Sequence, residues 1–128
     1  MVVENLEVTV FKGNPRQVNH TVLDQDTVGS PAKNLTGIAA RWVVSKLSAD
    51  GAPLATSILV KDSQVASGVT FPDAPNGELR ANLTAADTAG LPVGTHYFEC
   101  ELYDPAGTNP TLPLVVATGT ITVKQNVT

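Results

Sequence analysis

The sequence predicts an all-β fold, an antiparallel β-sandwich of seven to eight strands with one short helical turn. Apolar and polar residues alternate in short segments along most of the chain. Ten glycines and nine prolines interrupt these segments at intervals too short for a series of helices. The apolar share is 42% but the aromatic share only 5%, which suits thin layers of strands. At 128 residues we expect a single domain, residues 1–128, with one core.

The first predicted strands are separated by turn residues. Leu6, Val8 and Val10 share one face of the first strand, which ends before Gly13. Trp42, the only tryptophan, lies at the centre of the third and is expected in the core. The predicted strands are residues 6–11, 17–23, 38–45 and 54–61, and the β pattern continues through Val65, Val69 and Phe71.

A corner at residues 83–102 organises the second half of the chain. Thr84 is placed to cap a helical turn, and Asp87 three residues later completes a capping box. Gly90 is expected to end the turn in the left-handed conformation. A strand entered through a one-turn corner is the layout of the E to F connection in immunoglobulin-like domains, so we predict an immunoglobulin-like sandwich. A jelly roll or small barrel remains the alternative, because sequence determines strand count better than strand order.

Three more strands accompany this corner. The strand before it places Leu79, Ala81 and Leu83 on its inner face. Residues 104–107 have the composition of a type I turn, with Pro second and Gly fourth. Along the strand after the corner, one face contains His96, Phe98, Cys100 and Leu102. Along the last strand, 114–124, one face contains Val115, Ala117, Gly119, Ile121 and Val123. Gly119 indicates a bulge or a close approach of backbone.

Charge and composition exclude several classes of function. Eight basic and twelve acidic residues give a net charge of −4, and neither sign forms a block, so nucleic-acid binding is not expected. No stretch approaches the roughly 20 apolar residues of a membrane span, and Glu4 and Glu7 interrupt the N-terminal valines, so neither a membrane anchor nor an export signal is expected. The single Cys100 excludes an internal disulfide and is expected in the core.

The histidines and the cysteine do not form a catalytic or zinc-binding pattern. His20 and His96 are far apart in the sequence, and no second thiol accompanies Cys100. His96 and Cys100 point the same way along a strand, but at roughly 3.3 Å per residue they would lie about 13 Å apart, too far for a nucleophile and its base.

The carboxylates are equally unpromising for catalysis or metal binding. No glutamate closes the loop that contains Asp24 and Asp26, so a calcium site is not predicted. Glu99 and Glu101 are neighbours on the solvent face of a strand, with nothing to place them in a cleft. We therefore predict no enzyme activity, no cofactor and no metal site.

Three segments carry a resemblance to a known family. They are DQDTVGSPAKNLTG (24–37), NLTAADTAGLPVGTHYFECELYDPAG (82–107) and VVATGTITVKQNVT (115–128). Together they resemble small immunoglobulin-like virion proteins of tailed bacteriophages. The chain departs from immunoglobulin variable domains, because Tyr97 lies three rather than two residues before Cys100 and no partner cysteine exists. Neither a tyrosine corner nor an inter-sheet disulfide is therefore expected.

The resemblance implies a non-enzymatic virion structural protein, assembled in the host cytoplasm as a homo-oligomer or in many copies. Capsid decoration, by binding the lattice of the major capsid protein, is favoured over a tail, baseplate or neck role because the chain is a lone compact domain. The alternative is a carbohydrate- or cell-surface-binding module, for which Phe11, Tyr97 and Tyr103 are the candidate platform residues.

The two ends of the chain are the predicted interaction surface. This hypothesis rests on their terminal position and on the apolar residues near the N-terminus. The predicted contact residues are Val2, Val3, Leu6, Lys124 and Val127.

Overall fold

The computed structural model describes the backbone of residues 4–23, 31–48 and 50–126. Within these residues the chain forms eight strands, one α-helical turn and one 3₁₀ turn, in agreement with the predicted all-β fold. The strands are β1 (Glu4–Phe11), β2 (Arg16–Thr21), β3 (Ala39–Leu47), β4 (Pro53–Asp62), β5 (Val69–Asp73), β6 (Glu78–Leu83), β7 (Gly94–Tyr103) and β8 (Leu114–Lys124). The helical turns are η1 (Ala74–Asn76) and α1 (Ala85–Gly90).

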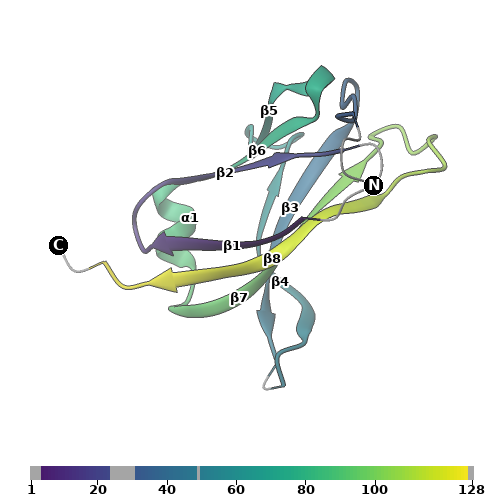
Figure 1. The fold of residues 1–128 in the computed structure, drawn as a ribbon. Coiled ribbons are helices and arrows are strands. Elements are labelled where there is room, and N and C mark those ends of the chain that lie inside the picture. The colour runs from purple at the N-terminus through teal and green to yellow at the C-terminus, as the bar shows by residue number, and fades with distance from the viewer. Residues whose placement is uncertain (1–3, 24–30, 49, 127–128) are drawn as a thin grey trace.

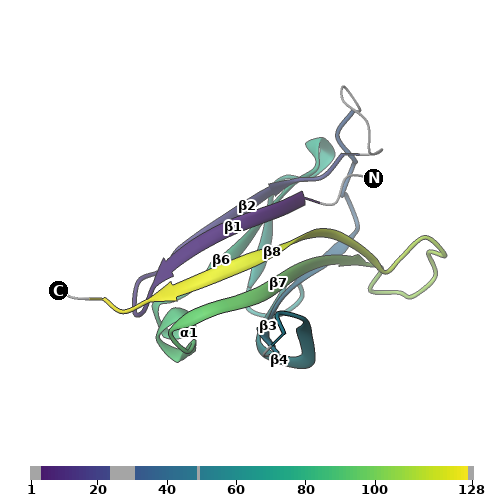
Figure 2. The same cartoon turned by 60° about the horizontal axis from the view of Figure 1, so that its bottom comes forward.

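The strands form two sheets that pack face to face (Figures 1 and 2). One sheet has the order β1-β8-β7-β3-β4 and the other the order β2-β6-β5. β1 pairs in parallel with β8, whereas the other pairs among the described strands are antiparallel. β2, β5 and β6 thus correspond to strands B, D and E of an immunoglobulin-like sandwich, and β3, β7 and β8 to strands C, F and G. This strand order confirms the immunoglobulin-like sandwich over the jelly roll or small barrel.

The corner between β6 and β7 has the predicted cap but a different end. The Thr84 hydroxyl accepts a hydrogen bond from the amide of Asp87 at 3.1 Å, and the Asp87 carboxylate accepts one from the amide of Thr84 at 2.8 Å. The prediction for Gly90 is wrong, because its φ is not positive and α1 ends in the extended residue Leu91. The Leu91 side chain is buried in the core, so the chain leaves the helix toward the interior without a left-handed residue.

The centre of the core is a three-residue cluster that joins the two sheets. Trp42 is fully buried, as predicted, and stacks on Phe98 with ring centroids 4.8 Å apart. Its indole Nε1–H donates to Nε2 of the buried His20 at 3.2 Å, so the proton of a neutral His20 imidazole lies on Nδ1. In antibody domains, the tryptophan of strand C packs against a disulfide between strands B and F. Here Trp42 contacts His20 on β2, the equivalent of strand B, and Phe98 on β7, the equivalent of strand F. Cys100 is buried farther along β7.

A histidine replaces the tyrosine that usually ties the corner to the following strand. His96 lies two residues before Phe98, and its Nε2 is 2.7 Å from the carbonyl oxygen of Pro92, four residues upstream. The hydroxyl of Tyr97 instead donates to Glu99 at 3.0 Å on the other face of β7. As predicted, Tyr97 does not form a tyrosine corner, and His96 makes the equivalent link to the backbone.

Gly119 permits the close approach of three strands. A Cβ atom at this position would lie 1.9 Å from the carbonyl oxygen of Leu6 and 2.8 Å from the ring of Phe98. The predicted close approach is therefore confirmed at Gly119. The prediction that Val115 shares a face with Ala117 is wrong, because a register shift opposite Cys100 and Glu101 makes Val116 the buried residue.

We predict that Gly119→Ala destabilises the protein by about 1–3 kcal/mol or more, because the added methyl group collides with backbone rather than with a flexible side chain. Urea unfolding of the wild type and the variant measures this loss. Gly90→Ala is the control, because nothing lies within 4 Å of its Cβ and its φ is not positive. The control is expected to match the wild type or to gain up to about 1 kcal/mol. Equal stability of the two variants would contradict the close approach.

Candidate interaction surface

The outer face of the five-stranded sheet carries a group of charged, aromatic and apolar side chains that are exposed or partly exposed. The strand register pairs Arg41 with Asp62 and Glu101, and Val43 with Val60 and Glu99, so these residues share the face opposite Trp42. The surface defined here as the network face consists of Arg41, Val43, Val60, Asp62, Val65, Glu99, Glu101 and Tyr103.

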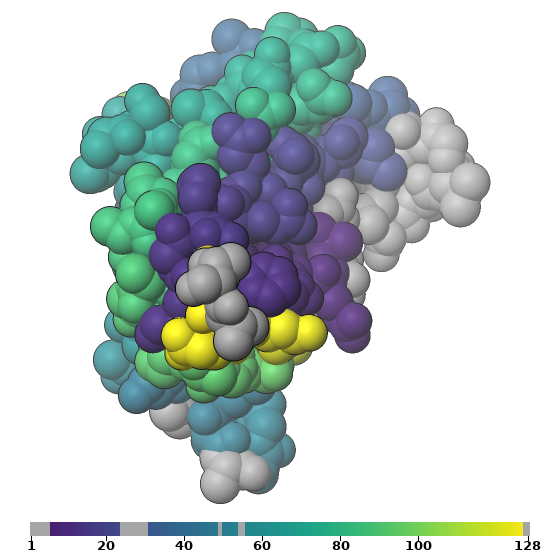
Figure 3. Space-filling model, turned by 90° about the vertical axis from the view of Figure 1, so that its left-hand side faces the viewer, coloured from purple at the N-terminus to yellow at the C-terminus, as the bar shows by residue number. Residues whose placement is uncertain are grey.

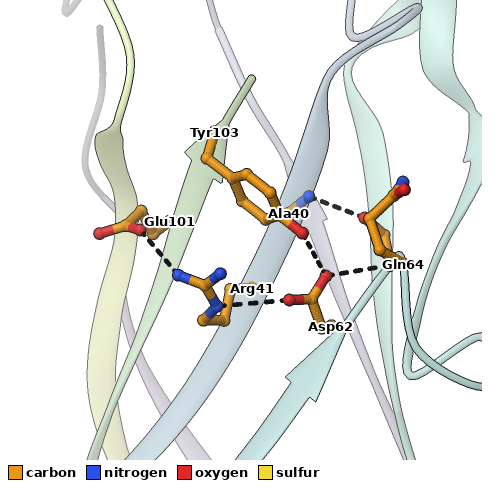
Figure 4. Close-up of polar contacts among 7 residues, drawn as sticks. Ala40, Arg41, Asp62, Gln64, Glu101 and Tyr103 are labelled. Carbon is orange, nitrogen blue, oxygen red and sulfur yellow. Dashed lines mark hydrogen bonds and ion pairs between the residues drawn. The ribbon is translucent and has the colours of Figure 1, made fainter. Parts of the chain in front are cut away.

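Charged and aromatic side chains from three strands hold one another in place on this face (Figure 4). Arg41 Nε donates to Asp62 Oδ2 at 3.3 Å, and Arg41 Nη1 lies 3.5 Å from Glu101 Oε1. The guanidinium lies over the ring of Tyr103, 4.6 Å from its centroid. The Tyr103 hydroxyl donates to Asp62 Oδ1 at 2.5 Å. Arg41 is thereby fixed in position while its side chain remains 40% exposed.

Asp62 also fixes the turn that follows β4. The amide of Gln64 donates to Asp62 Oδ1 at 2.9 Å. Ala66 and Ser67 have φ angles of 51° and 55°, a left-handed conformation that costs roughly 1–2 kcal/mol per residue without glycine. The side-chain amide of Asn82 binds the carbonyl of Ser67 at 3.1 Å and holds this conformation. The chain therefore keeps a strained turn in one fixed shape.

Two exposed valines lie beside the network. Val65 forms an antiparallel bridge with Asp62, so its side chain leaves the same face, and it is 64% exposed. Val60, two residues before Asp62 on β4, is 49% exposed. Arginine and tyrosine are enriched among the residues that contribute most to protein–protein binding, and here both lie next to two exposed apolar side chains.

The contacts within the network favour the ionised carboxylate of Asp62 and the neutral hydroxyl of Tyr103. Burial alone would raise the pKa of Asp62, but hydrogen bonds from Tyr103 and Gln64 and the charge of Arg41 outweigh it and lower the pKa. Burial and the neighbouring carboxylate of Asp62 raise the pKa of Tyr103, so its hydroxyl stays a neutral donor. Burial and Glu99 likewise raise the pKa of Tyr97 to about 12.

Of the predicted contact residues, the structure describes Leu6 and Lys124. Val2, Val3 and Val127 lie outside the described residues. Leu6 is partly buried against the core and pairs with Gly119, whereas Lys124 is exposed and pairs with Phe11 five residues farther along β1. The network face was not predicted from the sequence. Its signals there were the outward alternation of Arg41 and Val43 around Trp42 and the solvent-facing pair Glu99 and Glu101.

The residues considered for nucleophilic catalysis and zinc binding, His20, His96 and Cys100, are all buried. No group of three or more His, Cys, Asp or Glu side chains is placed to hold a metal ion in the part of the chain that is described. His20 and His96 are each bound within the interior, and Cys100 is fully buried. Asp24 and Asp26 lie outside the described residues. None of the helices between residues 4 and 126 that can be described has the length and hydrophobicity to span a bilayer.

Comparison with known proteins assigns the chain to no family. No protein-family model and no curated protein matches the sequence. Among solved structures, the chain is similar to the ZIG-8 IG1 homodimer at 15% identity and a TM-score of 0.42, covering 96% of this chain and 82% of that one. It is also similar to the ZIG-8–RIG-5 IG1–IG1 heterodimer at 16% identity and a TM-score of 0.42, covering 94% and 83%. The fold assignment rests on the strand order described above.

The network makes stability depend on pH through Asp62. Its pKa is lower in the folded than in the unfolded chain, so the ionised carboxylate stabilises the fold above about pH 4, and this contribution is lost as the pH falls through the folded value. We predict that Tyr103→Phe, which removes the hydroxyl donor but keeps the ring beside Arg41, moves the loss to higher pH.

Unfolding free energies measured in urea between about pH 2.5 and 7 test this prediction, each protein being compared with its own value at neutral pH. Asp62→Asn is the matched variant. It lacks the titrating group and is expected to show a flatter acid profile than the wild type. Superimposable profiles for the wild type and Tyr103→Phe would contradict the role assigned to the hydroxyl.

Proposed function

We propose that this chain is a non-enzymatic structural protein of a bacteriophage virion that decorates the capsid and binds the lattice of the major capsid protein through the network face. It is assembled in the host cytoplasm and is present in many copies. A place in the tail, baseplate or neck is the alternative within the same class. Two kinds of observation support the proposal, one from the surface and one from the sequence.

The observation that carries the proposal is the exposed apolar pair beside a fixed polar network. Val60 and Val65 are 49% and 64% exposed, while the arginine and tyrosine next to them are already held by partners within the chain. A surface that is ordered before binding loses little side-chain entropy when a partner docks. The sequence resemblance of residues 82–107 and 115–128 supports a virion as the setting.

Assembly in the cytoplasm fits the way the fold is stabilised. The chain has a single cysteine and so no internal disulfide, and the sandwich therefore needs no oxidising compartment. Its two sheets are held by packing and by hydrogen bonds within the core. Such a subunit can fold where capsid proteins are made and then bind a symmetric lattice.

The aromatic residues do not favour the carbohydrate-binding alternative. A sugar platform needs exposed aromatic rings side by side. Phe11 is 44% exposed on β1, whereas Tyr97 and Tyr103 lie six residues apart on β7, with hydroxyls committed to Glu99 and Asp62. The three rings therefore do not form a continuous platform.

Immunogold electron microscopy tests the virion proposal. An antibody raised against the purified chain is applied to phage particles produced by the host that carries its gene. Labelling distributed over the capsids is expected. Labelling confined to tails or necks would select the alternative role, and particles without label would contradict a virion role altogether.

Substitution at the network face tests how the protein binds. Val60→Asp places a charge in the apolar contact, and we predict at least about tenfold weaker co-sedimentation with capsids that lack the chain. Gln17→Glu is the matched control, because it adds the same charge on the outer face of the other sheet. Equal binding by the two variants would exclude the network face as the docking surface.

A further inference from the structure

The topology gives the sandwich two chemically different ends. The β1–β2 turn, α1 and the end of β8 meet at one end, called here the corner end and comprising residues 11–16, 84–94 and 123–126. Figure 3 shows this end, with the β1–β2 turn, the start of β7 and the end of β8 side by side. The opposite end, called the loop end, comprises residues 73–78 and 104–113 (Figure 2).

The corner end is basic. Lys12, Arg16 and Lys124 all belong to it, and Arg16 and Lys124 are exposed. Lys12 is anchored, because its Nζ donates to the carbonyl of Leu91 at 2.9 Å. The acidic residue of this end, Asp87, is neutralised by Lys61, whose Nζ lies 2.7 Å from Asp87 Oδ2. The described part of the corner end therefore carries an excess of positive charge.

Two exposed apolar side chains flank Lys124. Phe11 pairs with Lys124 across β1 and β8 and is 44% exposed. On the other side of β8, Gly94 pairs with Val123, and Val93, the residue before Gly94, therefore lies beside Lys124. The Val93 side chain is 57% exposed. These two, together with Val60 and Val65, are the large apolar side chains that are exposed in the described residues. A lysine between two apolar groups can bind a surface that is acidic and partly apolar.

The loop end has the complementary chemistry. Glu78 is exposed and pairs with Asp73 across β5 and β6. The backbone amide of Ala106 and the hydroxyl of Thr108 lower the pKa of Asp104, which stays ionised. Within the described residues, Lys33 is a basic residue near this end, its backbone lying close to Gly77. Three prolines, Pro75, Pro105 and Pro110, provide exposed apolar surface beside these carboxylates.

We propose that copies of this chain associate end to end, the corner end of one copy binding the loop end of the next. The contact joins two different surfaces, so it is heterologous and forms a closed ring or an open chain. Its partner is a second copy, selected because the excess of positive charge at one end matches the carboxylates at the other. The inference does not depend on capsid binding, which uses the network face.

Sedimentation velocity of the purified chain tests this inference. At about 20 mM salt we expect the mean sedimentation coefficient to rise with protein concentration, and at about 500 mM salt to remain that of a monomer, because salt screens exposed charges. A monomer at every concentration in low salt would overturn the inference. Association that is insensitive to salt would overturn it as well.

Charge reversal identifies the surfaces. Lys124→Glu is expected to weaken self-association at least about tenfold, and Glu78→Lys to do the same from the other end. Lys46→Glu is the matched control, an exposed lysine of β3 outside both ends. A mixture of Lys124→Glu and Glu78→Lys restores the opposite charges, so it is expected to associate where neither variant does alone. Failure of the mixture, or an equal effect of Lys46→Glu, would contradict the proposed pairing.

Discussion

The hydrogen bond between the indole of Trp42 and the imidazole of His20 is the constraint on which the sandwich depends. A buried donor left unpaired costs about 1–3 kcal/mol, and the acceptor for this one comes from the opposite sheet. Only a few relative positions of the two sheets therefore bring the acceptor within hydrogen-bonding distance of the indole N–H. With Phe98 stacked on the indole, this polar contact supplies the positional specificity that a disulfide gives to antibody domains.

The placement of Phe98 determines the position of the neighbouring elements. His96, two residues earlier on β7, ties the strand to the corner through the carbonyl of Pro92. Gly119 lies opposite Phe98, and its missing side chain lets β1 pack against β8. Strand alternation then directs Arg41 and Val43, the neighbours of Trp42, to the outer face. The network face therefore lies on the outer side of β3, and the contact of Trp42 with His20 and Phe98 lies on its inner side.

Features that depend on residues close together in the chain could be predicted from the sequence. The alternation around Trp42 and the cap formed by Thr84 and Asp87 are local patterns, and both agree with the structure. The partner of Trp42 could not be predicted, because His20 is brought to it by sheet packing across 22 residues. The network face needs the register of three strands, and a single bulge was enough to misplace Val115. Periodicity within one strand contains no information about register between strands.

A double-mutant cycle on Trp42→Phe and His20→Leu tests the core contact most directly. Each single change leaves one polar group without its partner, whereas the double variant removes both. Unfolding free energies of the four proteins should give a coupling of about 1–3 kcal/mol, with the double variant less destabilised than the sum of the singles. Additive losses would mean that the two side chains act independently, and would contradict the account of how the sheets are joined.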